Sequence, residues 1–151
     1  MRRILVSTFA LFGVFATQTL AADLVEKISP HSVEVTIDRL ADAVTGVGAT
    51  VFARVDHGAG AASVDLPLGA SQLLIFGNPK LGTPAMQASP TAGLDLPLRV
   101  LAYEDTGGTV RLVYHTPASF AETHGLPGDA KFIQMMTGAL DKLTGKAVAS
   151  E

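Results

Sequence analysis

Apolar and polar positions alternate, or recur at helical spacing, along most of the chain after residue 31. Alternation in Ser32–Ile37 predicts a half-buried strand. Apolar residues at helical spacing then predict a helix, capped by Asp38 at its start and stopped by Gly48. The alternation resumes in Ala49–His57 and predicts a second strand. The apolar positions of the first predicted strand are Val33, Val35 and Ile37.

The middle of the chain predicts a long connection, a buried strand and a short helix. Gly58–Ser71 is rich in small residues and contains proline, which predicts a connection with one helical turn around Ala61–Asp65. The apolar run Gln72–Gly77 predicts a central strand. A helix is predicted over Thr83–Ala88, because Thr83 suits the N-cap and a proline follows it at the first helical position.

The last third predicts a hairpin followed by two helices. Leu98–Tyr103 and Thr109–His115 flank a Thr-Gly-Gly turn and predict two antiparallel strands. A short helix is expected near Ala118–Thr123, and a longer one from about Asp129 to Leu143. The apolar stripe of the longer helix comprises Phe132, Met136, Ala139, Leu140 and Leu143. The order β-α-β4-α predicts an α+β fold, with a single antiparallel sheet and helices packed on one face.

The first 21 residues resemble a secretory signal peptide rather than a folded element. Arg2 and Arg3 precede the apolar run Ile4–Ala16, which is shorter than the roughly 20 residues needed to cross a bilayer. Small residues favour cleavage after Ala21, and Ala22 is the alternative position. We therefore expect a periplasmic or secreted protein with no stable membrane anchor after cleavage.

Composition supports one domain over residues 22–151, with its core over about 33–126 and in the C-terminal helix. Apolar residues make up 48% of the chain, which is enough to build a core. The chain contains no cysteine, which excludes disulfides, thiolate catalysis and cysteine metal sites. Without Arg2 and Arg3, nine Lys and Arg stand against 14 Asp and Glu, a net charge of −5. This acidic balance without a basic cluster argues against nucleic acid as a partner.

Histidines at strand ends are the first candidates for chemistry. His57 and His115 each end a predicted strand and would approach one another if both ends reached the same edge of the sheet. Two imidazoles and a carboxylate suit zinc or iron, and one imidazole beside a carboxylate suits a general base. A hydrogen-bonded structural role is the more frequent one at such positions. The carboxylates expected nearby are Asp56, Asp95 and Glu104, whereas His31 and His124 are predicted at the surface.

The segment Leu74–Gln87, LIFGNPKLGTPAMQ, combines glycine, lysine and threonine in a way that invites comparison with a phosphate-binding loop. It does not match G-x-x-x-x-G-K-[ST], and Pro79 removes a backbone donor. Asp95 stands just before a predicted strand, where it could bind a ligand or cap the neighbouring turn. Capping needs only local geometry. We predict no cofactor.

Four segments together carry a family resemblance. They are VFARVDHGAGAASVDL, LLIFGNPKLGTPAMQASP, GLDLPLRVLAYED and VRLVYHTPASFAETHGL. In this order and at this spacing, over about Val33–Leu126, they resemble the bacterial family known as domain of unknown function 302. The resemblance implies a TATA-binding-protein-like α+β fold and no established activity. The family's characteristic positions fall on Asp56, His57, Gly77, Asn78, Pro79, Gly82, Thr83, Pro84, Asp95, Leu96, Pro97 and Tyr114. His115 departs from the pattern, which favours a residue such as asparagine there, and this weakens a metal-binding role.

The patterns and the resemblance together predict one polar pocket at a rim of the sheet. All of its members lie at strand ends or on adjoining loops, where a rigid scaffold can present polar groups. They are Asp56, His57, Asn78, Thr83 and Asp95. In the alternative, Asn78, Thr83 and Asp95 only satisfy loop backbone groups while His57 braces them. We expect a ligand-binding or interaction module with a small-molecule ligand, forming a homodimer through a sheet edge or an apolar face. The alternative is a small enzyme or metal-dependent protein that uses His57 with Asp56 or Asp95.

Overall fold

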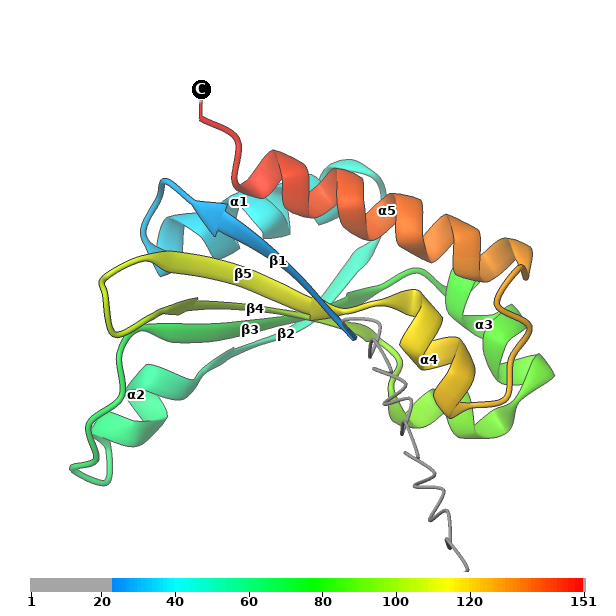
Figure 1. Cartoon of the computed structure of the whole chain (residues 1–151), viewed down its shortest axis with the longest axis horizontal. Helices are drawn as coiled ribbons and strands as arrows, with labels where there is room; N and C mark the ends of the chain where they lie inside the picture. Colours follow the sequence, from blue (N-terminus) through cyan, green and yellow to red (C-terminus); the bar gives the residue numbers. More distant parts are fainter. Residues whose placement is uncertain (1–22, 151) are drawn as a thin grey trace, which may run out of the picture.

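A single antiparallel sheet forms the centre of the molecule (Figure 1). The computed structural model of the chain describes residues 23–150, so the predicted signal peptide and its cleavage site lie outside the described residues. The strand order is β1-β5-β4-β3-β2. The strands are β1 (Leu24–Ser29), β2 (Thr50–Asp56), β3 (Ser71–Gly77), β4 (Leu98–Glu104) and β5 (Val110–His115). The central strand and the hairpin predicted from the sequence are confirmed.

Helices cover one face of the sheet and gather at its two ends. The long helices α1 (Val33–Gly46) and α5 (Lys131–Ala147) lie side by side on one face (Figure 1). At one end of the sheet is α2 (His57–Ala62), and at the other are α3 (Pro79–Ala88), the 3-10 helix η1 (Pro90–Leu94) and α4 (Pro117–Thr123). The predicted α+β fold with a β-α-β4-α order is confirmed, with the short helices inserted between its main elements.

Helix α1 begins where the sequence pattern predicts a strand, so the strand predicted over Ser32–Ile37 is wrong. Ser32, and not Asp38, caps the helix, because the Ser32 Oγ accepts a hydrogen bond from the Val35 N–H at 3.2 Å. Ile37 is fully buried while Val35 is 43% exposed, as helical rather than strand periodicity requires. The true first strand is β1, which adds to the sheet edge beside β5.

Two other predicted helices start at different residues. Helix α3 begins at Pro79 and not at Thr83, because the Asn78 Oδ1 accepts a hydrogen bond from the Lys80 N–H at 2.9 Å and caps the helix there. The helical turn expected around Ala61–Asp65 is helix α2, which starts directly after Asp56. Both helices therefore begin at a side-chain cap at the end of a strand.

The core fills the space between the sheet and the two long helices. Alternate residues of the three inner strands face this side and are buried: Leu74, Phe76, Val100, Ala102, Leu112 and Tyr114. A second, smaller cluster lies under the helices at one end: Ala85, Ala92, Ala121, Leu126, Ile133 and Met136. Met136, Leu140 and Leu143 of the predicted stripe are buried, whereas Phe132 and Ala139 are only partly buried.

No helix within residues 23–150 combines the length and apolar character that a membrane crossing requires.

Candidate functional site

The register of the sheet separates the residues predicted to share one pocket. Asp56 pairs with Gln72 at one end of β2 and β3, whereas Gly77, directly before Asn78, lies at the other end of β3. A strand of seven residues is roughly 20 Å long. Asp56 and His57 therefore lie far from Asn78, and the prediction of one shared pocket is wrong.

The same topology separates the two histidines considered as metal ligands. Two strands lie between β2 and β5 in an entirely antiparallel sheet, so these strands run in opposite directions. Their final residues, Asp56 with His57 after it and His115, consequently lie at opposite ends. Among residues 23–150, no cluster of three or more His, Asp or Glu side chains could hold a metal ion.

Asp56 has a structural role at its own end of the sheet. Its Oδ1 accepts a hydrogen bond from the Ala59 N–H at 2.8 Å, and its Oδ2 accepts one from Gln72 Nε2 at 3.0 Å. These bonds, the one from Ala59 first, lower the pKa of the Asp56 carboxyl below its usual range. The carboxylate thus caps helix α2, and His57, the first residue of that helix, is exposed.

Asn78 and Thr83 line an apolar hollow at the opposite end of the sheet. The hollow has a volume of about 290 Å³ and lies between α3, the start of β4 and α5. Its larger apolar side chains are Phe52, Leu81, Met86, Leu96, Pro97, Leu98 and Met136. Two segments noted in the sequence therefore form facing walls of one cavity. They are part of Leu74–Gln87 and residues Leu96–Leu98 of the Asp-Leu-Pro-Leu run, Asp95–Leu98.

Glycines allow these two walls to approach. A Cβ atom on Gly77 would lie 3.3 Å from Pro97 Cβ and 3.6 Å from Phe52 Cε2. A Cβ atom on Gly82 would lie 3.6 Å from Leu96 Cδ1. Side chains at these two positions would therefore occupy or deform the hollow, which gives a physical reason for glycine at each.

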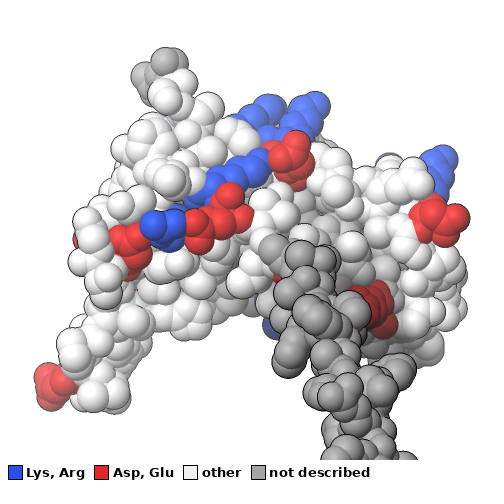
Figure 2. Space-filling view, viewed as in Figure 1, with Lys and Arg blue, Asp and Glu red and all other residues white. Residues whose placement is uncertain are grey.

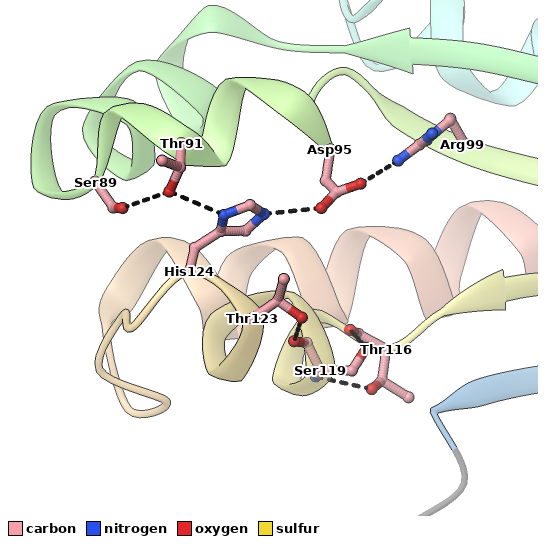
Figure 3. Close-up of polar contacts among 8 residues, drawn as sticks. All are labelled: Ser89, Thr91, Asp95, Arg99, Thr116, Ser119, Thr123 and His124. Carbon is pink, nitrogen blue, oxygen red and sulfur yellow. Dashed lines mark hydrogen bonds and ion pairs between the residues drawn. The ribbon is translucent and has the colours of Figure 1, made fainter.

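Asp95 lies in a second, neighbouring hollow of about 170 Å³, which shares Leu98 and Met136 with the first. His124 holds Asp95 in place, with its Nε2 2.8 Å from Asp95 Oδ2 and its Nδ1 3.1 Å from Thr91 Oγ1 (Figure 3). The other carboxylate oxygen accepts a hydrogen bond from the Arg99 guanidinium. Asp95 thus links η1, α4 and β4, and both imidazole nitrogens of His124 are engaged.

His124 is a functional candidate that the sequence pattern misplaces. The prediction of a surface position is wrong, since the His124 side chain is only 4% exposed. Its ring packs against Phe120, with 5.0 Å between ring centroids, and α4 and η1 enclose it. No local pattern marks this position, because its partners Thr91 and Asp95 lie about 30 residues earlier in the chain.

The paired state of Asp95 predicts a pH-dependent contribution to stability. The hydrogen bond from His124, followed by the bond and charge of Arg99, lowers the pKa of the Asp95 carboxyl. A carboxyl with a lowered pKa stabilises the fold above its unfolded value of 3.8, and this contribution disappears as the pH falls through the folded pKa. Because Asp95 is 40% exposed, solvent screening limits the contribution to about 1 kcal/mol. Urea unfolding at pH 7 and pH 3 should show Asp95→Asn less stable than wild type at pH 7, with a smaller gap at pH 3, because the contribution of Asp95 declines below pH 3.8.

The matched control for this prediction is Asp42→Asn, which alters an exposed carboxylate of α1. In this control, the free energy of unfolding should change between pH 7 and pH 3 by the same amount as in wild type. A stability gap between Asp95→Asn and wild type that persists unchanged at pH 3 would contradict the assignment.

The fold and the paired hollows place the chain among small α+β domains with one antiparallel sheet. The chain belongs to the family described as domain of unknown function DUF302, whose sequence profile matches residues 25–143. The crystal structure of an uncharacterized conserved DUF302 protein from Bacillus stearothermophilus is similar, with a TM-score of 0.76. That likeness covers 84% of this chain and 99% of the other at 16% sequence identity, so it shows the shared fold alone.

Two relatives with curated names match part of the chain. The fluoride-specific ion channel FluC 1 of Brucella suis biovar 1 (strain 1330) is 49% identical over 117 residues, 76% of this chain and 46% of the relative. FluC 2 of Brucella melitensis biotype 1 is also 49% identical over 117 residues, with 43% of that protein covered. The chain therefore spans less than half the length of these relatives, and their names assign no activity to it.

Proposed function

We propose that this chain is a ligand-binding domain whose site is the 290 Å³ hollow, and that it takes a small, largely apolar molecule. The main support is the convergence of Leu74–Gln87 and the Asp-Leu-Pro-Leu run on this one cavity. Its volume is close to the lower end of the range for small-molecule sites, about 300 Å³. Apolar walls with a few polar groups are typical of such sites.

The chemistry of the lining favours binding over catalysis. The side chains around the hollow include no histidine, carboxylate, lysine or arginine. Its polar side chains are those of Asn78 and Thr83, and the Asn78 Oδ1 already caps α3. A ligand would therefore be held mainly by removal of apolar surface from water, with Thr83 available for one directional hydrogen bond.

The alternative of an enzyme using His57 with Asp56 or Asp95 has no geometric support. Asp56 caps a helix, and Asp95 lies at the other end of the sheet in contact with His124. Export of the protein stays a prediction of the sequence.

Filling the hollow should weaken ligand binding. We expect Gly82→Leu to weaken binding of the neutral fluorescent probe N-phenyl-1-naphthylamine at least about tenfold, which corresponds to 1.4 kcal/mol. The new side chain would extend from α3 towards Leu96 and occupy the space that the probe needs. Titration by fluorescence, with saturation at one probe per chain in wild type, measures the effect.

The matched control is Gly60→Leu, which makes the same replacement in helix α2, where a Cβ atom meets nothing within 4 Å. Leucine favours helix over glycine at both positions, so both variants should fold. Equal probe affinity in Gly82→Leu and Gly60→Leu would refute the proposed site.

A further inference from the structure

Within residues 23–150, no helix covers the face of the sheet opposite α1 and α5 (Figure 1), and the middle of this face is apolar. Strand alternation turns Leu73, Ile75, Leu101 and Val113 to this side, where each is partly exposed and belongs to neither core cluster. At its margins Ile28 is 63% exposed, Phe52 57% and Val55 37%. We call this surface the open face. The same alternation turns Arg111, Glu26 and Arg99 to this side, so charged side chains lie beside the apolar middle of the face. An apolar area rimmed by polar groups marks an interaction site.

A projecting segment next to the open face is apolar as well. Residues 57–70, here called the arm, comprise α2 and the loop after it, and they extend beyond the sheet on the side away from α1 and α5 (Figure 1). Val64 is 61% exposed, Leu66 63% and Leu68 56%. These three exposed aliphatic side chains lie within five residues and extend the apolar character of the open face onto the arm.

The edges of the sheet are poorly suited to pairing with another chain. Figure 2 shows acidic and basic side chains along the β1 and β5 side of the molecule, where Lys27 pairs with Asp141 and Arg111 with Glu26. The other edge strand, β2, has an irregular register between Val51 and Ala53. Charges and bulges at edge strands oppose strand addition. The open face is therefore better suited to association than either edge of the sheet.

We propose that a second copy of this chain covers the open face, with the arm of each copy reaching the partner's sheet. The five strands present roughly 500 Å² in projection at ordinary strand spacing. A stable interface needs about 800 Å² per partner. The arm can supply the rest of this buried area. Each copy carries both the open face and the arm, as a two-fold symmetric interface requires.

Charge complementarity also favours a second copy. The arm contains Asp65 and no lysine or arginine, and its projecting end bears an acidic but no basic group in Figure 2. Arg99 and His115 lie at the opposite end of the sheet and alternate to the open side. When the two-fold axis lies between the two sheets and runs perpendicular to the strands, the strands of the two copies point in opposite directions. The arm of each copy then lies at the end of the partner's sheet that carries Arg99 and His115. Asp65 then lies near Arg99, a cation that this chain itself supplies and that also pairs with Asp95.

The oligomeric state of charged variants tests the proposal. The full chain, produced with its own leader, should sediment as a dimer at micromolar concentration. Leu101→Glu, at the centre of the open face, should weaken the dimer at least about 100-fold, because a carboxylate would be buried without a partner. Leu66→Glu, in the arm, should weaken it about tenfold. The control Met135→Glu changes a side chain of α5 that is 49% exposed and should leave the dimer intact.

Far-UV circular dichroism and the melting temperature establish whether each variant is folded. If Leu101→Glu does not fold, Val55→Glu on the same face takes its place. A wild-type chain that stays monomeric at every concentration overturns the proposal, and would leave the face to another protein or to another part of this chain. A dimer that survives both Leu101→Glu and Val55→Glu overturns it equally. A dimer unaffected by Leu66→Glu overturns the role of the arm.

Discussion

Replacing Phe76 with alanine is expected to lower the free energy of unfolding by about 3–5 kcal/mol. Phe76 lies on β3, is 2% exposed, and packs in the main core between the sheet and the long helices. Alanine would leave a cavity that the close-packed surroundings could close only in part. Urea unfolding followed by circular dichroism measures the loss.

Phe52→Ala is the matched control for this prediction. Phe52 lies on the neighbouring strand β2 but is 57% exposed, so its removal should cost less than about 1 kcal/mol. Because Phe52 also lines the proposed ligand hollow, the same variant should weaken probe binding without a large loss of stability. Similar stability losses for the two phenylalanines would contradict the description of the core.

Leu40→Ala should destabilise the protein by about 2–5 kcal/mol, whereas Val35→Ala should change stability by less than about 0.5 kcal/mol. Leu40 is fully buried on α1, but Val35 lies on the exposed side of the same helix. Alanine also favours a helix more than valine does, which offsets the small apolar area lost at Val35. Urea unfolding of the two single variants tests both values.

This pair of variants distinguishes the helix from the strand predicted over Ser32–Ile37. In that strand Val35 would share a buried face with Val33 and Ile37, and its truncation would be costly. A loss of more than about 1.5 kcal/mol for Val35→Ala would therefore favour the strand and count against α1 as described.

The order of elements could be predicted because most of the chain has one clear period. The run Gln72–Gly77 and the hairpin around Gly107 have strong local signals and are strands as expected. Ser32–Ile37 is ambiguous, because its alternating apolar residues also fit a helix that buries Val33, Ile37 and Leu40. The helix is favoured because β1 occupies the sheet edge and Ser32 supplies a cap. The predicted β-α-β4-α order is correct although its first strand was assigned to the wrong residues.

The candidate site was predicted only in part. Asn78 and Thr83 do line a cavity, but its walls also include Phe52 and Met136, which the sequence pattern marks only as strand and helix residues. Asp95 was expected to cap a turn or bind a ligand, and its partner is instead a histidine 29 positions later in the chain. Such partnerships depend on packing between distant segments, and local patterns do not encode them.

The sequence by itself determined the class of fold, the family, and the segments whose glycines and prolines need an unusual local backbone. The class of fold follows from periodicity and the local backbone from restrictions on φ, which act within a few residues. The family follows from the resemblance carried by four segments of the sequence. The tertiary structure alone decided which strand ends meet. Because the sheet is antiparallel, β2 and β5 end at opposite ends of the sheet, and His57 lies far from Asp95. The packing of α4 against η1 places His124 in contact with Asp95. Among residues 23–150 the tertiary structure also leaves one face of the sheet without a helix, because α1 and α5 both pack on the other.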